Sequence, residues 1–101
     1  MFREPITLAS GDELSVQAGQ HLYTVPRLDG AEAYTNVEVG NIDKIALPIT
    51  WYPYIESGAD FGELQVYPYI PAQLVYDFIQ EEGGYVSGEL PPLRLDNGTI
   101  F

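Results

Sequence analysis

Residues 45–93 contain no lysine, arginine or histidine. The same span carries seven carboxylates, which therefore have almost no cationic partner nearby in the sequence: Glu56, Asp60, Glu63, Asp77, Glu81, Glu82 and Glu89. Repulsion among like charges destabilises a compact chain, so the burial of apolar residues must outweigh it. A chain with this pattern either uses its charge for solubility or presents it to a positively charged partner.

The composition indicates one folded domain over residues 1–101. Of the 101 residues, 46% are hydrophobic and 13% are aromatic, whereas disordered acidic segments are poor in aromatic residues. A single core typically occupies about 100 to 150 residues. We therefore expect one acidic globular domain.

The charge is uneven along the sequence and favours one class of partner. The net charge is −11; residues 1–50 hold seven acids and three bases, and residues 51–101 hold eight acids and one base. Nucleic acids and anionic lipids attract basic surfaces, so we expect no direct nucleic-acid binding and no membrane binding. A basic protein surface is the favoured partner, with an association rate that falls as salt rises.

The residue types also restrict the chemistry. The chain has no cysteine, which excludes disulfides and thiolate metal sites, and His21 is its single histidine. We expect no metal and no cofactor. The absence of a long apolar run or an apolar leader predicts a cytoplasmic protein.

Short runs of alternating or β-branched residues, separated by glycine, proline and Asp/Asn turns, predict strands. They cover residues 5–9, 14–18, 21–25, 34–39 and 63–70. Residues 45–55 contain Pro48 and Pro53, which donate no hydrogen bond to a sheet, so this stretch predicts an edge strand or an irregular packed loop. After the helix, Gly88 and Pro91-Pro92 predict a loop, and residues 93–101 predict a hairpin around Asn97-Gly98.

Residues 71–82 predict the one helix, with a proline at its start and Gly83-Gly84 after its end. Leu74, Val75, Phe78 and Ile79 recur at helical spacing and form one apolar stripe. Together the elements predict an α+β fold: a small antiparallel sheet of four to six short strands with one C-terminal amphipathic helix.

Two aromatic segments are candidates for partner binding. The tetrapeptide Tyr-Pro-Tyr-Ile occurs at residues 52–55 and again at residues 67–70, and a tryptophan precedes the first copy. Tyrosine and tryptophan are enriched at interface hot spots, so these rings either form an exposed platform or pack inside the fold. The candidate anchors are Trp51, Tyr52, Tyr54, Tyr67 and Tyr69.

The carboxylates are the second candidate set. Asp77 and Glu81 lie four residues apart on the polar side of the predicted helix, about 6 Å along its axis. Together with Glu82 and the loop acids Glu56, Asp60 and Glu63, they predict a strip of negative charge that imitates a phosphate backbone. The alternative interpretation is a solvated polar face that keeps the protein soluble.

The general layout resembles the small proteins that phages and prophages encode, in particular anti-CRISPR and other anti-defence inhibitors. The segments that prompt this resemblance are residues 6–11, 34–40 and 71–84, together with the size, acidity and absence of cysteine. The resemblance implies a basic nucleic-acid-processing complex as the partner, and the host cytoplasm as the location. It carries no individual binding or catalytic residue.

The leading hypothesis is therefore a non-enzymatic inhibitor that covers the basic surface of a nucleic-acid-processing partner. One alternative is a structural or adaptor protein of the virion type, whose acidity serves solubility and whose Tyr-Pro-Tyr edges self-associate, for instance as a homodimer. The other is a small hydrolase that uses a pair of carboxylates.

Overall fold

The computed structural model describes residues 2–56 and 65–101. Within them the elements follow the order β1 (Ile6–Leu8), β2 (Glu13–Gln17), β3 (Asn36–Asn41), η1 (Ile49–Tyr54), β4 (Gln65–Pro71), α1 (Ala72–Glu81) and β5 (Tyr85–Ser87). Here η1 is a 3-10 helix and α1 an α-helix. The predicted α+β class is confirmed.

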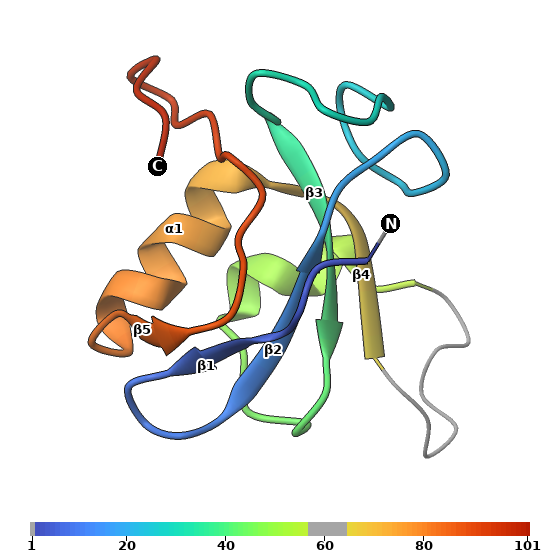
Figure 1. Cartoon of the computed structure of the whole chain (residues 1–101). Helices are drawn as coiled ribbons and strands as arrows, with labels where there is room; N and C mark the ends of the chain where they lie inside the picture. The colour runs from blue at the N-terminus through green and yellow to red at the C-terminus, as the bar shows by residue number, and fades with distance from the viewer. Residues whose placement is uncertain (1, 57–64) are drawn as a thin grey trace.

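The strands form one antiparallel sheet in the order β4-β3-β2-β1-β5. The first four strands lie in chain order, and β5 pairs with β1 at the far edge. The helix α1 therefore takes the chain from one edge of the sheet to the other, and it covers one face on the way (Figure 1). Helix and sheet bury their apolar sides against each other.

The helix forms where the sequence predicts it, and its apolar stripe is confirmed. Val75, Phe78 and Ile79 are buried together with Ala72, while Leu74 is half-buried. Gly83 follows the helix with a φ of 87°, a conformation that glycine adopts without a steric cost. The Gly84 amide then donates to the Ile79 carbonyl at 2.8 Å, which ends the helix in a glycine cap.

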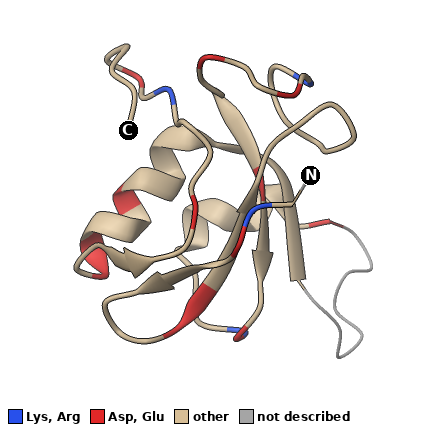
Figure 2. Cartoon of the chain, in the orientation of Figure 1, with Lys and Arg blue, Asp and Glu red and all other residues tan. Residues whose placement is uncertain are grey.

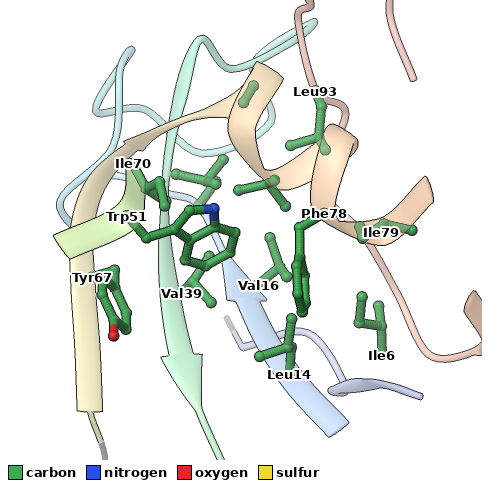
Figure 3. Close-up of a cluster of buried hydrophobic side chains, with 14 of the residues drawn as sticks. Ile6, Leu14, Val16, Val39, Trp51, Tyr67, Ile70, Phe78, Ile79 and Leu93 are labelled. Atoms are coloured by element: carbon green, nitrogen blue, oxygen red, sulfur yellow. The ribbon is translucent and has the colours of Figure 1, made fainter. Parts of the chain in front are cut away.

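The alternation of the strands supplies the other half of the core. Successive side chains of a strand point to opposite faces, and the inward set is fully buried: Ile6, Leu8, Leu14, Val16, Val37, Val39 and Ile70. Figure 3 shows several of these side chains directed toward the apolar side of α1. This burial has to offset the charge repulsion of the chain.

Residues 21–25 differ from the prediction, because they form a turn region with a single bridge between Val25 and Asn36. The Thr24 hydroxyl donates to the carbonyls of Gly19 and Pro26 at 3.3 and 3.0 Å. Such local side-chain bonds compete with a sheet ladder, and here they close the turn although the residues alternate.

Two further segments refine the prediction. Residues 49–54 form the 3-10 helix η1 in place of an edge strand, which agrees with the irregular packed alternative. Residues 85–87 form β5 in place of a loop, since they pair with β1. The terminal hairpin is confirmed: Leu93 and Phe101 exchange backbone hydrogen bonds at 3.1 and 2.9 Å, and Arg94 bridges Ile100.

Gly88 and Gly98 offer a matched test of the β5 region. Both have positive φ, of 96° and 88°, but a Cβ on Gly88 would overlap the Pro5 carbonyl and Ile6, whereas a Cβ on Gly98 would meet open space. Gly98→Ala should cost about 1–2 kcal/mol from backbone strain alone. Gly88→Ala should add the cost of overpacking, for a total of about 2–5 kcal/mol.

Urea unfolding of the two variants, followed by circular dichroism, measures this difference in the free energy of unfolding. Equal losses for the two alanine variants would contradict the close packing of Gly88 against β1.

Candidate protein-interaction surface

Trp51 and Tyr67, two of the predicted anchors, are inside the protein. Trp51 has 0% of its surface exposed and Tyr67 has 3%. The indole lies between Tyr67 and Phe78, with ring centroids 5.6 and 5.5 Å apart and the rings edge to face (Figure 3). Edge-to-face pairs are a favourable arrangement of aromatic rings. These two residues stabilise the core, so we remove them from the set of surface anchors.

The N–H group of the Trp51 indole is an unsatisfied hydrogen-bond donor, because its Nε1 is buried and has no hydrogen-bond partner within the described residues. A buried donor without a partner costs about 1–3 kcal/mol. The packing of the ring between β4 and α1 must therefore exceed this cost.

The geometry of the 3-10 helix η1 explains why Trp51 is buried and its neighbour Tyr52 is exposed. Residues three apart lie on the same side of a 3-10 helix. The outer side of η1 and the residue that follows it carries Ile49, Tyr52 and Ile55, with exposed fractions of 77%, 59% and 38%. Tyr54 is half-buried and packs against the core. Tyr52 is thus the exposed ring of the first Tyr-Pro-Tyr segment, and Tyr54 is the half-buried one.

The second Tyr-Pro-Tyr segment lies on β4, which is an edge of the sheet. Val39 pairs with Tyr67 and Val37 with Ile70, so Glu38 stands opposite both Pro68 and Tyr69. This β-bulge leaves Tyr69 at a φ of 55°, and bulges commonly redirect a side chain. The Tyr69 ring lies exposed against Tyr23, with centroids 5.6 Å apart.

The predicted acidic residues do not form one strip. Asp77 and Glu81 are exposed on α1, and Glu82 is half-buried at its end. Glu56 is exposed beside β4, where its amide donates to the Val66 carbonyl at 2.9 Å. Because α1 ends next to β5, at the sheet edge opposite β4, Glu56 and Glu81 lie far apart. Asp60 and Glu63 lie outside the described residues.

Figure 2 shows the same distribution, with acidic residues on α1, on strands and on several loops. Among the described residues, the acids of the predicted strip therefore occupy separate positions, on α1 and beside β4, rather than one continuous strip.

An aromatic cluster beside α1 was missed by the sequence analysis. The ring of Phe101 lies edge to face against Tyr76 at 4.8 Å and against Tyr85 at 6.4 Å. Tyr85 and Phe101 are 38% and 39% exposed. Their positions in the sequence are far apart, and only the folding of the terminal hairpin onto α1 brings them together.

Gln73 links the terminal hairpin, which carries Phe101, to Asp77 of the helix. Its Oε1 accepts a hydrogen bond from the Asp96 amide at 2.9 Å, and its Nε2 donates to Asp77 Oδ1 at 3.0 Å. Gln73 thus connects Asp77 to the terminal hairpin, whose Phe101 ring packs on Tyr76, so these residues border one region of the molecule. We call this the α1 surface and define it by Tyr76, Asp77, Glu81, Tyr85 and Phe101.

The α1 surface has no cation of its own. The helix contains no basic residue, and the single ion pair among residues 2–56 and 65–101 joins Arg94 to Glu32 at 3.8 Å. Arg94 also donates to the Gly98 carbonyl at 3.0 Å. Asp77 and Glu81 therefore carry negative charge without an intramolecular ion pair.

The described residues supply no metal centre. No group of three or more histidine, aspartate or glutamate side chains among them is placed to hold a metal ion. The exposed His21 contacts the Gln20 side chain at 3.2 Å. In the same part of the chain, no helix has the length and apolar character needed to cross a membrane.

Comparison of the chain with protein-family models, with curated protein sequences and with solved structures finds no match.

Trp51 and Tyr52 give a direct test of which aromatic rings belong to the core. Trp51→Ala should lower the free energy of unfolding by about 3–5 kcal/mol because it empties the space between β4 and α1. Tyr52→Ala should change it by less than about 0.5 kcal/mol, as is usual for exposed positions. Trp51→Phe retains a ring and removes the unpartnered N–H, so its loss should be smaller than that of Trp51→Ala.

Urea unfolding followed by circular dichroism provides the three values. A larger loss for Tyr52→Ala than for Trp51→Ala would reverse the assignment of the two rings.

Proposed function

We propose that this protein is a non-enzymatic binding protein that attaches to a basic protein surface through its α1 surface. The carrying observation is the pair of exposed carboxylates, Asp77 and Glu81, on a helix without a basic residue. An ordinary solvated surface mixes both signs of charge. Here Asp77 follows Tyr76 in the helix, and Tyr76 belongs to a cluster of three rings.

The two kinds of residue would serve different steps of binding. Charges accelerate the encounter between oppositely charged proteins and act over about 10 Å at 0.1 M salt. Aromatic rings that become buried in a contact supply most of the affinity. Asp77 and Glu81 would therefore set the association rate, and Tyr85 and Phe101 would set the dissociation rate.

The partner class follows from the charge. A protein surface rich in lysine and arginine is the complement of a chain with a net charge of −11, and such surfaces are typical of nucleic-acid-processing proteins. An acidic protein on such a surface would compete with the phosphate backbone. This would make the protein an inhibitor in the manner of the anti-defence proteins that its layout resembles, acting in the cytoplasm of the host.

Charge reversal on α1 tests the proposal. Asp77→Lys with Glu81→Lys changes the net charge by two at each position, from −11 to −7. Lysine near the helix C-terminus is favourable to the helix dipole by about 0.3–1 kcal/mol, so the fold should persist. The matched control, Glu4→Lys with Glu56→Lys, makes the same charge change at exposed positions outside the α1 surface.

The three proteins serve as bait in extracts of the native host, and the retained proteins are identified by mass spectrometry. The native chain and the control should retain the same basic protein, and the α1 variant should lose it. With the purified partner, the α1 variant should associate about tenfold more slowly at low salt, with little difference from the native chain near 1 M salt, where the Debye length is about 3 Å. Equal retention by all three baits would contradict the proposal.

A further inference from the structure

A groove on the β4 side of the molecule is separate from the α1 surface. It has a volume of about 430 Å³ and lies between η1, the turn after β3 and the start of β4. Its apolar walls come from Ile45, Leu47, Tyr52 and Ile55. Small-molecule sites typically have volumes of about 300–1,000 Å³, apolar walls and a few polar groups that orient the ligand.

Lys44 is the charged residue of this groove. Each of the three arginines has a partner: Arg3 donates to the Ala18 carbonyl at 2.9 Å, Arg27 lies 5.3 Å from the centre of the Tyr23 ring, and Arg94 pairs with Glu32. Lys44 alone among the cations of the described residues has no side-chain hydrogen bond, ion pair or ring contact. Its ammonium group is therefore available to an anion.

The segment that carries Lys44 is held in place by a buried amide. Asn41 is 0% exposed. Its Oδ1 accepts from the Ile45 amide at 3.1 Å, and its Nδ2 donates to the Ile45 carbonyl and to Gln65 Oε1, both at 2.9 Å. This fixes the ends of the turn and the side chain of Gln65, which also lines the groove. Gln65 Nε2 has no acceptor among residues 2–56 and 65–101, so its two hydrogens can be donated to a ligand.

The backbone of the turn is also unusual. Lys44 has a φ of 51°, in the left-handed region that residues with a Cβ other than asparagine and aspartate seldom adopt. Its neighbour Asp43 is bound elsewhere, because Asp43 Oδ2 accepts from the Glu13 amide at 2.7 Å. The carboxylate next in sequence is thus engaged with β2 rather than with the Lys44 ammonium.

We propose that this groove binds a small amphipathic carboxylate. The apolar body of the ligand lies along Ile45, Leu47 and Ile55, and its carboxylate accepts hydrogen bonds from Lys44 Nζ and Gln65 Nε2. The net charge of −11 repels anions in general, so the local cation and the apolar contact are both needed. This inference is independent of the function proposed for the α1 surface.

Octanoate is the probe, with 1-octanol and octylamine as controls of equal chain length. Each is titrated into the labelled full chain while NMR follows the Gln65 side-chain amide and the methyl groups of Ile45, Leu47 and Ile55. The fluorescence of Trp51, the single tryptophan, gives a second readout because its ring contacts Tyr67 of the groove. Octanoate should shift these signals at lower concentration than 1-octanol, and octylamine should not compete.

Lys44→Asn removes the charge with a residue that tolerates the left-handed conformation, so the turn should persist. Arg27→Asn makes the same charge change away from the groove. Lys44→Asn should weaken octanoate binding up to about fivefold, the upper end of the range for loss of one exposed charge contact, with Lys44→Arg close to the native value and Arg27→Asn unchanged. Absence of saturable octanoate binding, equal binding of 1-octanol, or equal weakening by Lys44→Asn and Arg27→Asn would overturn the proposal.

Discussion

The contact between Trp51 and Phe78 holds the molecule together at its centre. It joins η1 to α1, and the contact of the same indole with Tyr67 adds β4. Without it, the helix that spans the sheet would lose the aromatic packing that joins it to η1 and β4. The placement of the exposed groups on α1 and η1 depends on this packing, because these helices present their outer sides only when their inner sides are buried.

The charge of the chain is placed around this core rather than inside it. All the described aspartates and glutamates are exposed or half-buried, and one ion pair joins the described charges. Repulsion among these exposed carboxylates therefore opposes folding, and the buried apolar core must outweigh it. On α1, Asp77 follows Tyr76 of the aromatic cluster, whereas Lys44 lines a largely apolar groove. The two places differ in charge and in the size of the molecule that could occupy them.

Local sequence patterns predicted correctly those elements that are stabilised by residues close together in the sequence. The apolar stripe of α1, the glycines after it and the Asn97-Gly98 hairpin follow from spacing and turn chemistry, and they are present as predicted. The strand predicted at residues 21–25 is wrong, because alternation alone does not reveal the Thr24 hydroxyl bonds that close a turn there. The strand at residues 85–87 was not predicted, because it forms by pairing with β1, about 80 residues earlier in the chain.

The candidate site was harder to predict because it depends on contacts between distant residues. The two identical Tyr-Pro-Tyr segments adopt a 3-10 helix and an edge strand, so the same residues have different exposure. The cluster of Tyr76, Tyr85 and Phe101 has no signal in the sequence beyond the presence of three rings. The sequence likewise did not indicate that Asn41 is buried and hydrogen-bonds both the turn that carries Lys44 and Gln65, since Gln65 comes 24 residues later.

The central claim is that most of the described acidic side chains form no intramolecular ion pair, and that their mutual repulsion lowers the stability of the fold. The most direct measurement is the free energy of unfolding of the native chain in urea at sodium chloride concentrations from about 0.01 M to 1 M, over which the Debye length falls from about 30 Å to 3 Å. If the charges mainly repel one another, the free energy of unfolding rises as salt screens them. A value that stays constant or falls with salt would show that the acids are compensated within the fold, and it would contradict this account.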